Sequence, residues 1–254
     1  IVLVTGPTGS GKTTTLYAAL SAANDTGRKI ITIEDPVEYQ LPGIAQIQVR
    51  EEIGLTFAAG LRSVLRHDPD VVLIGEIRDR ETAEIAVRAA LTGHLVLSTL
   101  HTNDSVSAVT RLLEMRVEPF LVGSSLVSSI AQRLAQRLCP ACRAPEPGLA
   151  EPLRQEMAAV LNLAPAEVRS FHGRGCAECE GRGYRGRVAI YEFFNVSDAL
   201  ADLIRPGVRT GELREAARRE GWRSLREAGW AKVQAGLIPV TELRRLTHRL
   251  HAAA

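Results

Sequence analysis

Aromatic residues and net charge are both scarce in this chain of 254 residues. Only 4% of the residues are aromatic, so no set of rings for stacking the bases of a nucleic-acid strand is apparent. The formal net charge is only +2, which gives no general electrostatic reason to bind nucleic acid or a membrane. There is also no run of eighteen apolar residues, so the sequence predicts no membrane-spanning helix.

The clearest positive signal is a glycine-rich segment near the start of the chain. Residues 6–13 read Gly-Pro-Thr-Gly-Ser-Gly-Lys-Thr, between a strand pattern at residues 1–5 and a helical pattern at about 13–23. The glycines allow backbone N–H groups to point at phosphate, next to the positive end of the helix. Lys12 can reach the β- and γ-phosphates, and Thr13 offers a hydroxyl to Mg²⁺. The predicted nucleotide-binding residues are Gly6, Pro7, Thr8, Gly9, Ser10, Gly11, Lys12, Thr13 and Thr14.

Strand and helix patterns alternate along the first half of the chain, which favours a mostly parallel sheet with helices on both faces. Strands are expected at residues 1–5, 29–35, 46–49, 71–76 and 94–101, and helices at about 13–23, 56–67, 80–92 and 104–115. After about residue 138 the composition changes. Further helices are expected at about 151–163, 197–205, 210–220, 224–235 and 239–250, with a strand at 188–193. We therefore divide the chain into residues 1–138, 139–187 and 188–254.

Reactive side chains occur where these strands end, and in open parallel sheets ligands bind beyond the carboxyl ends of the strands. Glu76 closes an apolar run and is placed as a Walker B carboxylate that holds Mg²⁺. Glu34 closes another, and is the first candidate for the base that activates water. His101 follows a third strand and can contact the γ-phosphate. Glu38 is the second candidate base, and Asp35 can instead support the turn before a proline.

The roles of His94 and of the arginines are left open by the sequence. His94 and His101 are separated by seven strand steps, roughly 23 Å, so they cannot bind one ion. His94 lies at the opposite end of its strand and has a structural or a functional role. Arginines neutralise phosphate charge in this chemistry, often from a neighbouring subunit. The candidates are Arg62, Arg66, Arg78 and Arg80, and each alone is also a plausible surface charge.

The only four cysteines form two Cys-x-x-Cys pairs, Cys139 with Cys142 and Cys176 with Cys179. Two such pairs complete a tetrahedral Cys₄ zinc site, which leaves no open position and therefore serves structure. Redox use of one pair is the alternative, but a thioredoxin-like context is lacking. Disulfides are disfavoured because a nucleotide-hydrolysing domain is expected in a reducing cytosol. Residues 173–186, rich in glycine, are expected to wrap the metal.

The motifs together resemble the C-terminal ATPase domain of the secretion ATPase superfamily, in the branch that serves type II secretion and type IV pilus assembly. Residues 6–15 are similar to the family's Walker A motif, and residues 31–39 resemble its Asp box. Residues 65–79 resemble its Walker B motif, and residues 92–103 its His box. The tetracysteine segment matches the assembly branch rather than the retraction motors. Residues 35–49 and 118–126 favour type II secretion over pilus assembly.

This resemblance implies a RecA-like P-loop core at residues 1–138, a zinc-binding subdomain at 139–187 and a mainly helical subdomain at 188–254. It implies a homo-hexamer in the cytoplasm, peripheral to the inner membrane. The hexamer is expected to hydrolyse ATP and, with platform and adaptor proteins as its partners, to drive pseudopilin or pilin subunits out of the membrane. By the same resemblance Glu34 is the catalytic glutamate, Glu76 the magnesium residue and His101 a γ-phosphate contact. The family has an N-terminal domain that supplies arginines to the nucleotide, and we expect this chain, which begins with Ile1, to lack it.

Two other functions remain as rivals. A motor that translocates DNA is disfavoured by the near-neutral charge and the few aromatic residues. A regulator that binds ATP without hydrolysing it is disfavoured because Lys12, Thr13, Glu34 and Glu76 occur together.

Overall fold

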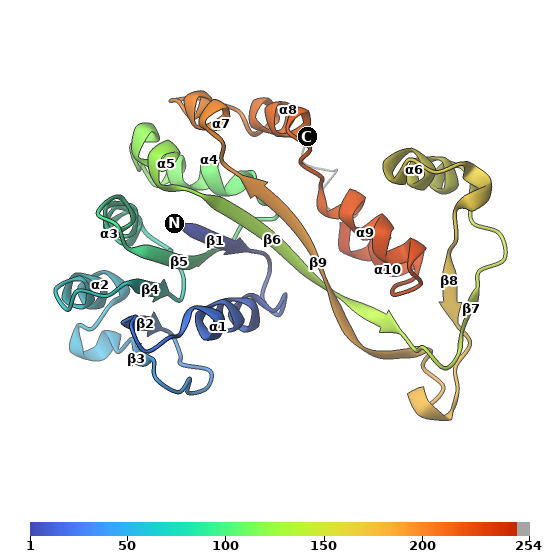
Figure 1. Ribbon diagram of the computed structural model, residues 1–254, viewed down its shortest axis with the longest axis horizontal. Helices are drawn as coiled ribbons and strands as arrows, with labels where there is room; N and C mark the ends of the chain where they lie inside the picture. The colour runs from blue at the N-terminus through green and yellow to red at the C-terminus, as the bar shows by residue number, and fades with distance from the viewer. Residues whose placement is uncertain (248–254) are drawn as a thin grey trace. The chain divides into compact units, whose positions relative to one another are not determined.

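The computed structural model describes residues 1–247, and a seven-stranded sheet runs through it (Figure 1). In spatial order the strands are β3 (Ala45–Gln48), β2 (Ile30–Glu34), β4 (Val71–Ile74), β5 (Leu95–Leu100), β1 (Val2–Thr5), β6 (Ser128–Leu138) and β9 (Tyr184–Asn195). The five pairings from β3 to β6 are parallel. The predicted parallel α/β sheet is therefore confirmed, and the carboxyl ends of β1, β2, β4 and β5 lie along one edge.

Apolar residues alternate between the two faces of the sheet, as the strand period of two requires. On β1, Val4 packs with one hydrophobic cluster and Leu3 with the other. The first cluster contains the buried residues of α1 (Lys12–Ala23), whereas the second contains residues of six other helices. These are α2 (Phe57–Leu65), α3 (Arg80–Leu91), α4 (Ser107–Glu114), α5 (Pro119–Ser125), α7 (Asp198–Leu203) and α8 (Thr210–Arg219). The prediction of helices on both faces is confirmed.

The elements α5 and β6 were not expected from the sequence, and neither were the short strands β7 (Arg143–Pro145) and β8 (Phe171–Gly173). Residues 128–138 place Ile130, Leu134 and Leu138 four residues apart among Ala, Gln and Arg, a pattern typical of a helix. They form a strand because β6 pairs with β1 through residues 128–131 and with β9 on its other side, which uses its backbone groups. Tertiary pairing therefore overrides the local helix preference here.

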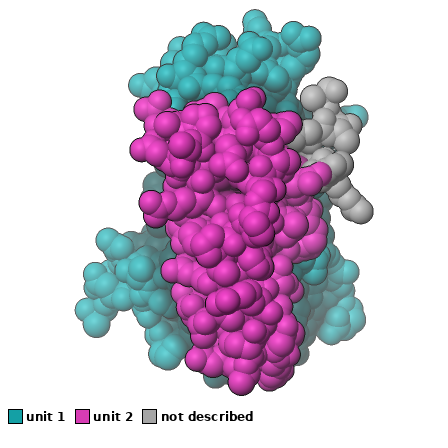
Figure 2. Space-filling model, turned by 90° about the vertical axis from the view of Figure 1, so that its right-hand side faces the viewer, with its two compact units in different colours: residues 1–131, 193–222 teal, residues 132–192, 223–254 magenta. Residues whose placement is uncertain are grey.

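The chain divides into two compact units (Figure 2). Unit 1 contains residues 1–131 and 193–222, and unit 2 contains residues 132–192 and 223–254. The strands β6 and β9 both continue from one unit into the other. The three-part division expected from the sequence stays a prediction.

Unit 2 combines three helices with a two-stranded antiparallel sheet. Its remaining elements are β7 (Arg143–Pro145), α6 (Glu151–Leu161), β8 (Phe171–Gly173), α9 (Leu225–Gln234) and α10 (Val240–Thr247). Trp230 on α9 is fully buried, and its ring N–H donates to Oε1 of Glu156 on α6 at 3.0 Å. A Cβ on Gly229 would lie 2.2 Å from a methyl of Leu243, so glycine permits the close packing of α9 on α10. The helix expected at 239–250 is described to Thr247, and residues 248–250 lie outside the described residues.

Short single-turn 3₁₀ helices occupy residues 51–53, 165–167 and 177–179. Among the described residues, no helix combines the length and the apolar character needed to cross a bilayer.

Candidate nucleotide-binding and hydrolysis site

The glycine-rich loop lies where the sequence predicts it, between Thr5 at the end of β1 and Lys12 at the start of α1. Gly9 and Gly11 have φ angles of 78° and 88°, a region that residues with a side chain rarely adopt. Gly11 in this conformation directly precedes α1, whose first turn has N–H groups without partners inside the helix. The loop and this helix end thus form the kind of N–H-rich, electropositive surface that binds phosphate.

Lys12 and Thr13 begin the helix that follows the loop. The Lys12 ammonium donates to the carbonyl oxygens of Gly6 at 2.9 Å and Pro7 at 3.2 Å, so its charge lies over the loop. Thr13 is half-buried beside it. These positions fit a lysine that contacts phosphate and a hydroxyl that binds Mg²⁺.

Glu34 is the last residue of β2, and only 3% of its surface is exposed. Its Oε2 accepts a hydrogen bond from the Tyr17 hydroxyl, and its Oε1 accepts from the Thr32 hydroxyl and from the Gln46 amide, the latter at 3.1 Å. A carboxylate has about four acceptor positions, so one more donor can bind at Oε2. Glu34 is thus held rigidly at the edge of the sheet that carries the phosphate loop.

The residues that hold Glu34 were missed by the sequence reasoning. Thr32 could have been found, because it lies two residues before Glu34 and shares its face of the strand. Tyr17 and Gln46 carry no such signal, since they come from α1 and β3. Burial, followed by the contact with Glu34, raises the pKa of Tyr17 above its usual value, so Tyr17 remains a hydrogen-bond donor at neutral pH.

Glu76 follows β4 and contacts two basic side chains, those of Arg78 and His101. Its Oε1 forms an ion pair with Arg78, and its Oε2 lies 3.2 Å from Nε2 of His101. The hydrogen bond to Glu76 raises the pKa of Arg78 above its already high value, so the guanidinium stays charged. The structure therefore brings together Glu76 and His101, which the sequence had placed at the ends of neighbouring strands. Asp35 also lies near this group, 4.0 Å from Arg78.

Gly75 lies between β4 and Glu76, where the neighbouring strand β2 leaves little room for a side chain. A Cβ at this position would lie 3.3 Å from both the Cα of Glu34 and the carbonyl oxygen of Ile33. The backbone N–H of Gly75 donates to the same Ile33 oxygen at 2.7 Å. The glycine therefore allows β4 and β2 to approach each other closely where Glu34 and Glu76 leave the sheet.

His94 lies at the other edge of the sheet and contacts the end of α3. Its Nδ1 is 2.9 Å from the carbonyl oxygen of Ala89 and 3.1 Å from the Thr92 hydroxyl. The last carbonyl groups of a helix have no partners within it, and this ring contacts one of them. These contacts favour a structural role for His94 over a functional one.

The candidate arginines differ in their surroundings. Arg62 forms an ion pair with Glu81, and Arg80 one with Glu84 at 2.6 Å, both at the surface. Arg66 contacts the Ser63 hydroxyl at 3.4 Å. Within the described residues, the contacts of Arg78 are the ones that reach the candidate site.

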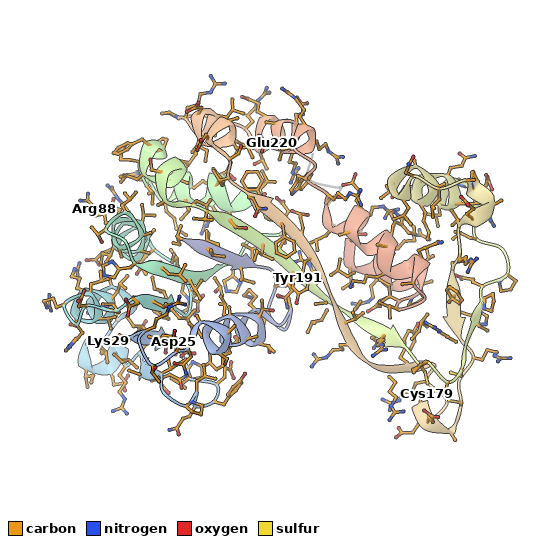
Figure 3. The ribbon with its side chains drawn as sticks, in the orientation of Figure 1. Asp25, Lys29, Arg88, Cys179, Tyr191 and Glu220 are labelled. Atoms are coloured by element: carbon orange, nitrogen blue, oxygen red, sulfur yellow. The ribbon has the colours of Figure 1, made fainter. Side chains whose placement is uncertain are left out.

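The four cysteines converge in unit 2, where Figure 3 labels Cys179. All four sulfur atoms lie within 4.8 Å of one another. The distances are 3.9 Å from Cys139 to Cys176, 3.8 Å from Cys142 to Cys179, and 3.7 Å from Cys176 to Cys179. A tetrahedral ion with Zn–S bonds of about 2.3 Å places its sulfur ligands about 3.8 Å apart. The cluster therefore has the dimensions and the donor set of a Cys₄ zinc site.

Backbone contacts at Cys179 also suit a thiolate ligand. Burial acts to raise the pKa of Cys179, but the N–H groups of Cys176 and Gly183 donate to its sulfur, at 3.3 and 3.2 Å, and lower the pKa to about 7. A Cβ on Gly173 would lie 2.2 Å from the carbonyl oxygen of Gly183, so glycine is needed where these loops cross. This crossing explains why the segment around the second cysteine pair is rich in glycine.

Comparison with known proteins gives a match over residues 1–245 to the family described as type II/IV secretion system protein. The chain belongs to this family. It is 53% identical over 250 residues to type II secretion system protein E of Pseudomonas aeruginosa, covering 97% of this chain and 48% of that protein. It is also 53% identical over 246 residues to the type IV pilus assembly ATPase PilB of Myxococcus xanthus, covering 96% and 43%. The chain thus spans about half the length of these curated relatives.

Among solved structures, the chain resembles the pilus retraction motor PilT, crystallised with bound ADP. The TM-score is 0.70 at 30% sequence identity, over 96% of this chain and 60% of that chain. The secretion family and its α/β fold, expected from the motifs, are confirmed.

Proposed function

We propose that this chain is the ATP-hydrolysing motor domain of a type II secretion machine, with a RecA-like P-loop core. The observation that carries the proposal is the shared sheet edge, where the phosphate loop, Glu34 and the contact between Glu76 and His101 follow parallel strands. The identity of 53% to a type II secretion protein E supports the biological setting.

Each residue then has a defined part in hydrolysis. The loop N–H groups and Lys12 bind the phosphates. Thr13 and Glu76 would hold Mg²⁺, and the ion would supply positive charge next to the phosphates. Glu34 orients and deprotonates the attacking water through the free acceptor position on its Oε2. His101, which lies beside Glu76, contacts the γ-phosphate.

In unit 2, the four cysteines hold Zn²⁺ as a structural ion. The match between the observed sulfur distances and tetrahedral geometry supports this assignment. A closed Cys₄ site has no place for substrate, so its contribution is to stabilise the fold of the loops around it.

The family also suggests how the domain works in the cell. We propose that it acts as a homo-hexamer, in the cytoplasm at the inner membrane, with platform and adaptor proteins of the secretion machine. Hydrolysis would move the domains and drive pseudopilus assembly and protein export. One arginine from another subunit or domain would complete the nucleotide site.

The proposed role in type II secretion is tested by deleting the gene in the source bacterium and complementing the deletion with the wild-type gene or with Lys12→Ala. We expect the deletion to stop protein export, the wild type to restore it and Lys12→Ala to fail, because the lysine that binds phosphate is gone. Surface pili are counted in the same strains.

The second candidate is a type IV pilus assembly ATPase, which the identity of 53% to PilB favours. Loss of pili with normal export would establish this candidate and contradict the proposal. Copurification of the full-length protein with secretion or pilus membrane proteins gives an independent answer.

A further inference from the structure

The loop after β5 carries His101 at its start and a nearly buried acid, Asp104, three residues later. Only 8% of Asp104 is exposed. Its Oδ1 accepts a hydrogen bond from the backbone N–H of Ser107 at 2.9 Å, and its Oδ2 accepts from the Ser107 hydroxyl at 2.8 Å. Asp104 therefore satisfies donors at the start of α4.

The same carboxylate also forms an ion pair with an arginine on a helix that is distant in sequence. Nη2 of Arg214, on α8, donates to Oδ2 of Asp104 at 2.8 Å. The side chains of Asp104 and Arg214 are 11% and 32% exposed, so water screens this pair less than an exposed surface pair. The loop is thus held by a helix that comes 110 residues later in the chain.

Further contacts join this loop to the end of β1 and to the segment that follows α8. The carbonyl oxygen of Asp104 accepts from the hydroxyls of Thr102 at 2.9 Å and Thr5 at 3.5 Å, and Thr5 is the last residue of β1. The Trp222 ring N–H donates to the Ser105 hydroxyl at 3.4 Å. Figure 1 shows α4 and α8 near each other, and the two helices are in contact.

We propose that Arg214 is a positioning residue for ATP hydrolysis. Its ion pair with Asp104 fixes the loop at residues 101–106, and this keeps Nε2 of His101 at the Glu76 carboxylate. The inference rests on the proposed hydrolysis at this site. Loss of a residue that orients a metal-binding side chain without itself binding the metal typically lowers metal affinity or activity by roughly 10- to 100-fold.

Two substitutions separate this role from simple capping of α4. Asn caps a helix about as well as Asp, so Asp104→Asn keeps the cap but removes the charge that Arg214 contacts. Arg214→Gln removes the other partner. The matched control is Arg209→Gln on the same stretch of chain, since Arg209 is exposed and contacts Glu212.

The measurement is steady-state ATP hydrolysis by the assembled full-length protein. For Arg214→Gln and Asp104→Asn we expect kcat to fall about tenfold, with KM for ATP within about twofold of the wild-type value. Arg214→Lys restores part of kcat because it returns the charge. Arg209→Gln keeps the wild-type kcat, and thermal unfolding of each variant verifies the fold.

A double variant tests whether Arg214 acts through His101. We expect Arg214→Gln to cause no further loss in a protein that already carries His101→Gln, since residues in one network are not additive. Multiplied losses, or a normal kcat for Arg214→Gln, would overturn the inference. If His101→Gln alone lowers kcat while Arg214→Gln does not, only the inference is wrong. If neither changes kcat, the proposed hydrolysis site is wrong as well.

Discussion

Replacing Tyr17 by Phe removes one hydroxyl from the buried group around Glu34. Tyr17 is 1% exposed and its hydroxyl donates to Oε2 of Glu34. The ring still fills the same space, so the change creates almost no cavity. The main loss is a hydrogen bond to a buried charged group, worth about 1.5–3 kcal/mol. The hydroxyl also accepts two longer hydrogen bonds, from the Glu38 N–H at 3.4 Å and the Gln46 amide at 3.3 Å.

We therefore expect Tyr17→Phe to lower the free energy of unfolding by about 2 kcal/mol. For a folded unit of about 150–250 residues, this loss corresponds to a fall in Tm of about 4–8 °C. The assay is urea-induced unfolding followed by circular dichroism at pH 7, with the slope against urea compared between variants to exclude a change in the unfolded state.

Tyr39→Phe is the matched control. The Tyr39 ring packs edge-on against Tyr17 with ring centroids 4.7 Å apart, but Tyr39 is 53% exposed. Its loss of a hydroxyl should change the stability by no more than about 0.5 kcal/mol. Equal losses of unfolding free energy in the two variants would refute the reasoning. They would mean that the buried hydrogen bond from Tyr17 to Glu34 contributes no more to stability than the exposed hydroxyl of Tyr39.

Three further predictions follow from the same structure. Because burial raises the pKa of Tyr17 in the folded state, the Tyr17 hydroxyl of the unfolded state loses its proton first as the pH rises above 10. The free energy of unfolding of the wild type should therefore approach that of Tyr17→Phe above pH 10, by up to about 1.4 kcal/mol per pH unit. Urea titrations that show a constant difference between the two proteins would contradict this. Gly173→Ala should destabilise unit 2 and weaken metal retention, since a Cβ would lie 2.2 Å from the Gly183 carbonyl oxygen; metal analysis and proteolysis equal to wild type would oppose it. Purified protein should contain about one zinc per chain, and Cys176→Ser should lose it together with stability; a variant with full metal content and unchanged Tm would refute the zinc site.

Much of the core could be predicted because local signals agreed with the fold. The strand at residues 30–34 and the helix at 12–23 follow from apolar runs and a glycine-rich turn, which depend on neighbours in sequence. The sequence also located Glu76 and His101, since parallel strands bring their carboxyl ends to one edge.

Other features depend on contacts that no local pattern encodes. Residues 128–138 have the composition of a helix, but pairing with β1 at residues 128–131 and with β9 makes them a strand. The Tyr17 hydroxyl and the Arg214 guanidinium reach their carboxylates across 17 and 110 residues of sequence. The need for glycine at position 75 likewise depends on Glu34 and Ile33, which a Cβ there would crowd.

The most direct test of the proposed hydrolysis site is ATP turnover by the assembled full-length protein with Glu34→Gln, Glu76→Gln or Glu38→Gln. Nucleotide binding is measured alongside turnover. We expect Glu34→Gln and Glu76→Gln to lower kcat by about 100-fold or more while Glu34→Gln still binds ATP, because each removes a carboxylate needed in the transition state. Wild-type turnover by either variant, or loss of turnover by Glu38→Gln alone, would contradict the assignment of Glu34 and Glu76.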